Sequence, residues 1–314
     1  MTCVKPQFLN RILARERVAN LRSLMGAYEN WQHVVLARLF NGNASVVLKD
    51  YPNARLHAHW RDLVGFASLS HHGWKIESFG RGSVLLRNQT NLSIWCRTSK
   101  GGDLAALNSI FVDKVFGDNL KGKTVLDVGT GNGDSSIFFA SNGARFVVGV
   151  EPFSESFDLS NINIRLNSLT ERIRCVPWAI SGFTGNGFLF VHEARFDGNR
   201  LLSPDDAVST NSPAQAVRTF TLRDFMKVLG IEWFDFVKLD CEGAEYSILR
   251  AALTDGVLHT KIGELVVEFH HGVQNLAKIL QREGFETTIR FDAGPNTGYI
   301  AARRDNWAKV PSVA

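Results

Sequence analysis

The chain has 314 residues, of which 45% are hydrophobic and 21% charged, and its formal net charge is +4. This content is enough for one large globular domain or two modest ones, and so weak a basic balance does not single out a nucleic-acid binder. Four scattered cysteines (Cys3, Cys96, Cys175, Cys241) without C-x-x-C spacing argue against a zinc site or a disulfide framework.

The amino-terminal segment, MTCVKPQFLNRILARERVAN, lacks the apolar run of a signal peptide. No stretch of the chain approaches the length of a transmembrane helix. We therefore expect a cytoplasmic protein with no membrane span.

Apolar residues between Leu9 and Trp31 recur at spacings that suit one face of a helix, and arginines populate its other faces. The pattern favours a helix that packs within the chain or forms a homo-oligomer, and a membrane-surface or RNA-binding helix is the alternative. After Gly42, four short β-rich runs predict a small β-meander; they lie at residues 45–51, 73–79, 83–89 and 92–98. A helix over 104–116 follows, and we place residues 1–115 in an accessory region of N-terminal helices and meander.

Strand and helix signals alternate throughout residues 116–314, which we assign to a second domain. Five apolar runs predict buried strands of a mainly parallel sheet, at 124–128, 145–151, 173–180, 234–240 and 264–270. Amphipathic segments between them predict helices at 135–143, 157–169, 222–230, 244–253 and 273–284. The last two strands, 286–291 and 299–304, predict a terminal β-hairpin, so the fold expected is an α/β, αβα sandwich.

Two glycine-rich patterns lie almost end to end around the first strand. Residues 117–124 fit G-x-x-x-x-G-K-T, but Lys123 and Thr124 lead into a strand, whereas a triphosphate loop must open a helix. We therefore interpret the first pattern as a turn.

The second glycine pattern, D-V-G-T-G-N-G at residues 127–133, follows a strand and precedes a helix that Asp134, Ser135 and Ser136 can cap. Asp127 at the strand end suits a ligand with a free amino group, and Glu151 at the end of the next strand suits a ribose. The ligand with an amino acid at one end and a ribose at the other is S-adenosylmethionine. Its predicted contacts are Asp127, Gly129, Thr130, Gly131, Asn132, Gly133, Ser135, Glu151, Pro152, Trp178, Ala179 and Asp240.

Several stretches resemble the FkbM family of Rossmann-like S-adenosylmethionine-dependent methyltransferases. They are VLDVGTGNGDSSIFFA, VVGVEPFSESFDLSNINIRLNSLTERI, VPWAISGFTGNGFLF and, above all, FDFVKLDCEGAEYSIL with VVEFH after it, and the resemblance covers residues 95–302. It implies a seven-stranded sheet with an antiparallel last strand. It also implies O-methylation of hydroxyls on glycans or small metabolites.

Acidic residues and a histidine follow two core strands where the ligands of such sheets lie. The candidates for catalysis are Lys238, Asp240, Glu242, Glu268 and His270. His270 has the ordinary pKa best suited to a general base, although it could equally be a strand-end histidine without catalytic role. Glu242 could instead cap the next helix, as we expect of Glu245, and Trp178 could stack on adenine or belong to the core. The acidic residues allow a metal site, but nothing fixes a ligand count, and we predict none.

Two other functions stay open at this point. One is an RNA ribose methyltransferase, and the other is a catalytically silent scaffold that binds the cofactor. Asp240-Cys241-Glu242-Gly243 stands where base N-methyltransferases commonly carry an Asn/Asp-Pro-Pro-aromatic motif, which argues against methylation of a base and leaves ribose methylation open. We expect a small-molecule or glycan substrate rather than nucleic acid.

Overall fold

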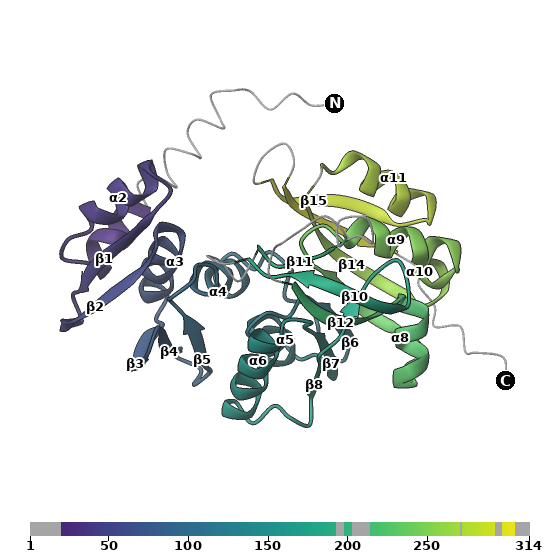
Figure 1. The fold of residues 1–314 in the computed structure, drawn as a ribbon, viewed down its shortest axis with the longest axis horizontal. Coiled ribbons are helices and arrows are strands. Elements are labelled where there is room, and N and C mark those ends of the chain that lie inside the picture. Colours follow the sequence, from purple (N-terminus) through teal and green to yellow (C-terminus); the bar gives the residue numbers. More distant parts are fainter. Residues whose placement is uncertain (1–19, 193–197, 203–213, 271, 293–296, 305–314) are drawn as a thin grey trace. The chain divides into compact units, whose positions relative to one another are not determined.

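The computed structural model describes residues 20–192, 198–202, 214–270, 272–292 and 297–304. By contact density the chain divides into two compact units, residues 1–113 and 114–314, and each is described by itself (Figure 1). Residues 9–19 of the helix predicted between Leu9 and Trp31 lie outside the described residues. Within the described ranges, no helix is both long and apolar enough to cross a membrane.

The first unit contains two small antiparallel sheets separated by a helix. After a helical stretch at residues 20–27, its elements are α2 (Gln32–Leu39), β1 (Asn43–Leu48), β2 (Tyr51–His59), α3 (Trp60–His71), β3 (Lys75–Gly80), β4 (Ser83–Arg87), β5 (Ser93–Arg97) and α4 (Asp103–Phe111). β1 pairs with β2, whereas β3, β4 and β5 form the meander. The prediction of one four-run meander was therefore wrong: only Leu56 and Ala58 of β2 are buried, too few for a visible alternation.

The helix predicted through Trp31 ends at residue 27 because Tyr28 makes tertiary contacts in place of helical ones. The Tyr28 side chain is fully buried, and its hydroxyl donates a hydrogen bond of 2.7 Å to the carbonyl oxygen of Leu63. Its backbone forms an isolated bridge with Leu48. These contacts replace helical ones, so the chain turns before α2 begins.

Asp62 on α3 holds the start of α4. Its buried carboxylate accepts backbone N–H bonds of 3.0–3.2 Å from Gly102, Leu104 and Ala105, which would otherwise be left without partners at the helix end. Beside it, Arg97 and Asp103 form a buried ion pair, with 2.9 Å between Nη2 and Oδ1. The described part of the first unit is thus tied together by buried carboxylates.

The second unit is built on a seven-stranded sheet of order β15-β16-β14-β13-β6-β7-β8. The elements of this sheet and the helices that connect them are β6 (Thr124–Val128), α5 (Asp134–Ser141), β7 (Phe146–Val150), α6 (Ser154–Leu166), β8 (Ile173–Val176), α8 (Leu222–Leu229), β13 (Phe234–Leu239), α9 (Glu245–Thr254), α10 (Val257–Thr260), β14 (Ile262–Phe269), α11 (Gln274–Arg282), β15 (Glu286–Asp292) and β16 (Gly298–Arg303). β16 runs antiparallel to both neighbours, and the strands from β14 to β8 are parallel. The predicted Rossmann-like fold with an antiparallel last strand is confirmed.

The single strand predicted over 173–180 is two strands in different sheets. β8 ends before Pro177, which has no N–H to continue the ladder, and β9 (Ala179–Ile180) pairs with β12 (Ala214–Phe220). With β10 (Gly185–Phe190) and β11 (Arg200–Leu201) they form a four-stranded sheet that the sequence patterns did not predict.

The G-K-T pattern lies at the start of β6, as the sequence analysis expected. Thr124 is the first residue of that strand, and its N–H donates to Asp235. The Lys123 ammonium lies 2.9 Å from Glu264 Oε1, near the start of β14. Lys123 therefore occupies the amino-terminal edge of the parallel strands, the edge opposite to their ligand-binding ends.

We predict that Asp62→Ala lowers the free energy of unfolding by about 3 kcal/mol, because buried N–H groups at the start of α4 lose their acceptor. Denaturation in urea measures this difference. The exposed Asp50, changed to Ala in the same unit, is the control and should shift stability by no more than about 0.5 kcal/mol. Equal losses in the two variants would contradict the role assigned to Asp62.

Candidate active site

The glycine loop between β6 and α5 packs against the end of β13 and is open on its other side. Gly129, Gly131 and Gly133 have φ angles of 78°, 54° and 91°, which disfavour any residue with a side chain. A Cβ on Gly129 would lie 1.8 Å from the backbone oxygen of Asp240. A Cβ on Gly131 would meet no atom within 4 Å, so the loop leaves space for a ligand there.

Side chains from the neighbouring elements hold this loop in place. Glu151 accepts the Gly131 N–H through Oε2 at 2.9 Å and the Phe153 N–H through Oε1 at 2.9 Å. Asn163 on α6, which is fully buried, donates to the carbonyl oxygen of Asn132 at 2.9 Å. The structure thus adds Asn163 to the site, a residue that the sequence analysis did not single out because only the fold brings α6 to the loop.

Asp127 lies behind the loop and is completely buried. Its Oδ2 accepts hydrogen bonds of 2.6 Å from both Ser135 and Ser136, and its Oδ1 lies 3.1 Å from Lys238 Nζ. The two serines were predicted to cap α5, but the N-cap position is held by Gly133, with no side-chain cap. That prediction was wrong because a buried carboxylate is the stronger acceptor for their hydroxyls.

Lys238 is the only fully buried ammonium among the described residues, and it links the loop to β13. Its Nζ donates to the carbonyl oxygen of Gly129 at 2.6 Å and lies 3.4 Å from Asp240 Oδ2. Burial lowers the pKa of Lys238, but the carboxylates of Asp127 and Asp240 outweigh that effect and raise its pKa above the ordinary value. Lys238 therefore stays protonated and organises the site instead of accepting protons.

Asp240 and Glu268 form a coupled acidic pair at the carboxyl ends of β13 and β14. Burial raises the pKa of Asp240, but Lys238 and the Glu268 hydrogen bond outweigh it, so its pKa lies below the ordinary value. Burial and the Asp240 carboxylate raise the pKa of Glu268 well above its usual range. Of the two, Asp240 is therefore the stronger acid.

Tyr299 lies directly opposite Glu268 in the pairing of β16 with β14. Burial first, and then the carboxylates of Asp240 and Glu268, raise the pKa of its hydroxyl well above 10. The sequence analysis missed this tyrosine because no motif contains it. Only the strand register places this hydroxyl beside the acidic pair.

His270 follows β14 and is surrounded by carboxylates. Its Nε2 lies 3.3 Å from Glu242 Oε2, and its Nδ1 lies 3.4 Å from Glu245 Oε1. Burial lowers the pKa of His270, but Glu245 and Glu242 outweigh this and raise it to about 9. The imidazole is therefore protonated at neutral pH, which removes the reason given above for choosing it as the general base.

The loop before α9 carries the remaining acidic residues of the site. Glu242 adopts a left-handed conformation with φ of 54°, which is uncommon for a residue with a side chain. Glu245 is completely buried, and its Oε1 accepts the backbone N–H of Cys241 at 2.9 Å. Glu245 thus belongs to the shell around His270 as well as to the start of the helix.

The residues predicted to border the adenine lie beyond β7 and β8. Trp178 is half-buried and packs on the rings of Phe220 and Phe225, with centroids 5.0 and 6.1 Å away. The carbonyl oxygen of Pro152 accepts a hydrogen bond of 2.7 Å from Gln215, and Ala179 is buried in β9. Their cofactor contacts stay predictions.

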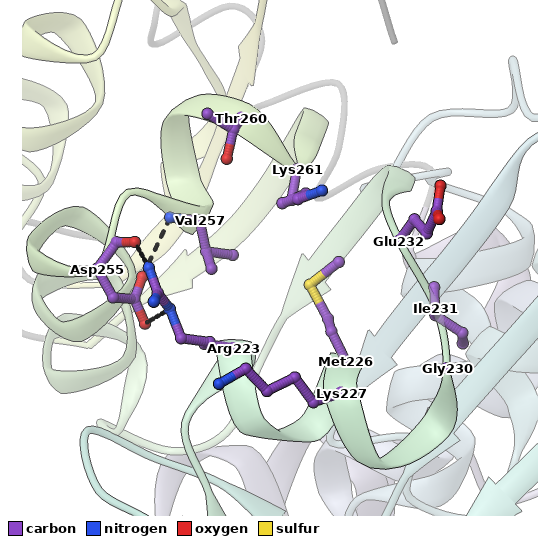
Figure 2. Close-up of a pocket in the computed structure, with 10 residues that line it drawn as sticks. All are labelled: Arg223, Met226, Lys227, Gly230, Ile231, Glu232, Asp255, Val257, Thr260 and Lys261. Carbon is purple, nitrogen blue, oxygen red and sulfur yellow. Dashed lines mark hydrogen bonds and ion pairs between the residues drawn. The ribbon is translucent and has the colours of Figure 1, made fainter. Parts of the chain in front are cut away.

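A separate cavity of about 520 Å³ lies at the amino-terminal ends of β13 and β14, between α8 and α10 (Figure 2). Arg223 and Asp255 pair across it, while Lys227 and Lys261 lie on its lining. None of the predicted site residues lines it. Because ligands of parallel sheets bind at the carboxyl ends of the strands, we assign the active site to the glycine loop and the acidic cluster.

Comparisons with known proteins found a matching family model and several similar solved structures. The family model of the methyltransferase FkbM domain matches residues 127–287, just over half of the chain. A solved structure of a methyltransferase FkbM from Methylobacillus flagellatus KT is similar at 14% identity and a TM-score of 0.41, over 65% of this chain and 56% of that one. The chain thus spans little more than half of that protein.

Two further solved structures contain ligands named in their descriptions. M. capricolum TrmK in complex with S-adenosyl-homocysteine is 13% identical with a TM-score of 0.37, over 66% of this chain and 71% of that one. Magnesium protoporphyrin IX methyltransferase from Synechocystis PCC 6803 with bound SAM is 15% identical with a TM-score of 0.37, over 64% and 78%.

We predict that Gly129→Ala is far more disruptive than Gly122→Ala, although their φ angles are nearly equal at 78° and 74°. Both variants force a side chain into a left-handed conformation, at about 1–2 kcal/mol. Only at Gly129 does the new methyl group meet backbone, so we expect a total loss of about 3 kcal/mol or more. Urea denaturation of both variants measures the difference, and equal losses would contradict the close packing of the loop on β13.

We also predict that the His270 ring titrates near pH 9, well above its ordinary value of 6.5. A raised pKa in the folded state means that protonation of His270 stabilises the fold fully below pH 6.5, and that this contribution is lost as the pH rises through 9. NMR titration of the ring protons measures the pKa directly. Glu245→Gln should move it down toward 6.5, and a ring that titrates near 6.5 in the unchanged protein would refute the arrangement.

Proposed function

The chain belongs to the FkbM methyltransferase family, and we propose that it binds S-adenosylmethionine and methylates a hydroxyl oxygen of a small metabolite or glycan. One observation carries this proposal: a glycine loop that is open at Gly131 abuts an ionised carboxylate, Asp240, at the carboxyl end of the parallel sheet. The space that we propose for the cofactor, beside Gly131, therefore adjoins Asp240, a group able to accept a proton.

The residues around the loop fit S-adenosylmethionine. Gly131 lacks neighbours on its open side, so a ligand can approach the backbone closely. Glu151 ends β7 and lies beside the loop, where its carboxylate can accept hydrogen bonds from ribose hydroxyls. Asp127 is enclosed by protein groups, so we propose that it supports the ligand through the loop and Lys238. When bound, S-adenosylmethionine supplies a methyl group activated by a sulfonium.

Asp240 is the best candidate for the base. The pKa values of Glu268 and His270 are raised and Lys238 is a cation, whereas the pKa of Asp240 lies below its ordinary value, so Asp240 is the candidate whose ionised form the site favours. Its carboxylate can orient the acceptor hydroxyl and take its proton. The positive charge of Lys238 stabilises the anionic carboxylates that surround the acceptor.

We further propose roles for the two parts of the chain. Residues 116–314 carry the methyltransferase site, and residues 1–115 form an accessory region. Partly exposed apolar side chains in the first unit, including Met25, Leu36 and Leu39, are consistent with a homo-oligomer formed through the N-terminal helices. A cytoplasmic location stays a prediction.

Two measurements on the full chain test the function. S-adenosylmethionine at 100 times its Kd should stabilise the protein by about 2.7 kcal/mol, and ATP should not. With labelled S-adenosylmethionine and fractionated glycans and metabolites, Asp240→Asn should reduce methyl transfer by about 100-fold or more while stabilisation by the cofactor persists. Asp158→Asn, which removes an exposed carboxylate on α6, is the control and should leave both unchanged.

Three outcomes would contradict the proposal. Stabilisation by ATP and not by S-adenosylmethionine would exclude the cofactor. Transfer of the label to RNA alone would favour the ribose methyltransferase. Binding without turnover in any fraction would favour the silent scaffold.

A further inference from the structure

Asp240, Glu268 and His270 come together from the ends of two adjacent strands. Each offers one oxygen or nitrogen atom, and these atoms all lie within 4.8 Å of one another. Among the described residues, this is the one group of at least three such side chains with this spacing. All three side chains are partly accessible to solvent, so an ion could reach them.

The spacing matches the coordination sphere of one divalent cation. Oxygen and nitrogen ligands lie about 2.0–2.4 Å from such ions, so ligands on opposite sides of an ion are separated by roughly 4–4.8 Å. Lys238 holds Asp240 Oδ2 at 3.4 Å, which leaves the second oxygen of Asp240 for the cluster. Small side-chain rotations are therefore enough to place all three ligands around an ion.

A second observation concerns the surroundings of the histidine. A metal-bound imidazole usually carries a carboxylate or carbonyl on its other nitrogen, which fixes its orientation. Here His270 Nε2 faces Glu242 and Glu268, at 3.3 and 3.9 Å, while Nδ1 faces the buried Glu245 at 3.4 Å. Glu245 Oε2 is buried without a hydrogen-bond partner among the described residues. The Glu245 carboxylate therefore lies beside His270 with one oxygen still able to accept a hydrogen bond.

We propose that Asp240, Glu268 and His270 bind a divalent cation, with Glu245 orienting the histidine and Glu242 at the rim. Two carboxylates and one imidazole suit Mn²⁺ or Mg²⁺ better than metals that prefer thiolates. This differs from the metal-free site expected from the sequence, where the ligands could not be counted.

The remaining coordination positions define a class of acceptor, an inference that rests on the proposed function. Three protein ligands leave open positions on a cation that prefers six oxygen or nitrogen atoms. The acceptor that fills them best has a hydroxyl beside a second oxygen, as in a vicinal diol of a sugar or an α-hydroxy acid. Coordination of both oxygens would present one hydroxyl at the glycine-loop side of the cluster.

Titration of the full chain with Mn²⁺, followed by the loss of the free-ion EPR signal, tests the site without any cofactor. The unchanged protein should bind one ion. Glu268→Gln and His270→Gln should weaken binding by about 100-fold or more, and Glu245→Gln by about 10- to 100-fold. Glu264→Gln is the matched control: it lies on the same strand, is paired with Lys123 at the other end of the sheet, and should bind like the unchanged protein.

Thermal unfolding checks that each variant is folded. Absence of Mn²⁺ binding, or equal binding by Glu268→Gln and Glu264→Gln, would overturn the site. Undiminished methyl transfer in EDTA would overturn the role of the cation in acceptor binding. The proposed function fails separately, by absence of stabilisation with S-adenosylmethionine, because that measurement depends on the glycine loop and Glu151 and needs no cation.

Discussion

The buried ammonium of Lys238 is the contact on which the organisation of the site depends. It lies between Asp127 at the end of β6 and Asp240 just after β13, and it binds the carbonyl oxygen of Gly129 in the loop between β6 and α5. An unpaired charge at this depth would be costly. Removal of Lys238 would leave buried carboxylates without a counter-charge, and removal of the carboxylates would leave the ammonium unpaired. The glycine loop and the acidic cluster are therefore parts of one electrostatic unit.

Charge also explains why the acidic cluster can persist in the folded protein. Asp240, Glu242, Glu245 and Glu268 converge on one strand edge, and full ionisation of all four would be strongly repulsive. The structure relieves the repulsion because burial and the neighbouring carboxylates raise the pKa of Glu268 well above its ordinary value, and because His270, whose pKa is raised to about 9, lies among the carboxylates. The same features leave Asp240 as the group that stays ionised.

The sequence was informative wherever a local pattern reports local structure. Buried strands such as 124–128 and 234–240 are continuous apolar runs, and the glycines at 129, 131 and 133 mark a loop that only they can form. Contacts between segments far apart in the chain could not be predicted from local patterns. Tyr299 reaches the site through strand register, Glu245 reaches His270 through the placement of α9, and β2 becomes a strand only because β1 pairs with it.

The position of β16 has a consequence for how the protein is made. This strand is inserted between β14 and β15, and it carries Tyr299 to the acidic cluster although it is the last strand of the sheet in the chain. While the ribosome is still elongating, β14 exposes an unpaired edge and Glu268 lacks its tyrosine neighbour. The acidic cluster can therefore be complete only after residues 298–303 have been synthesised, and until then the open edge of β14 can pair wrongly with other strands.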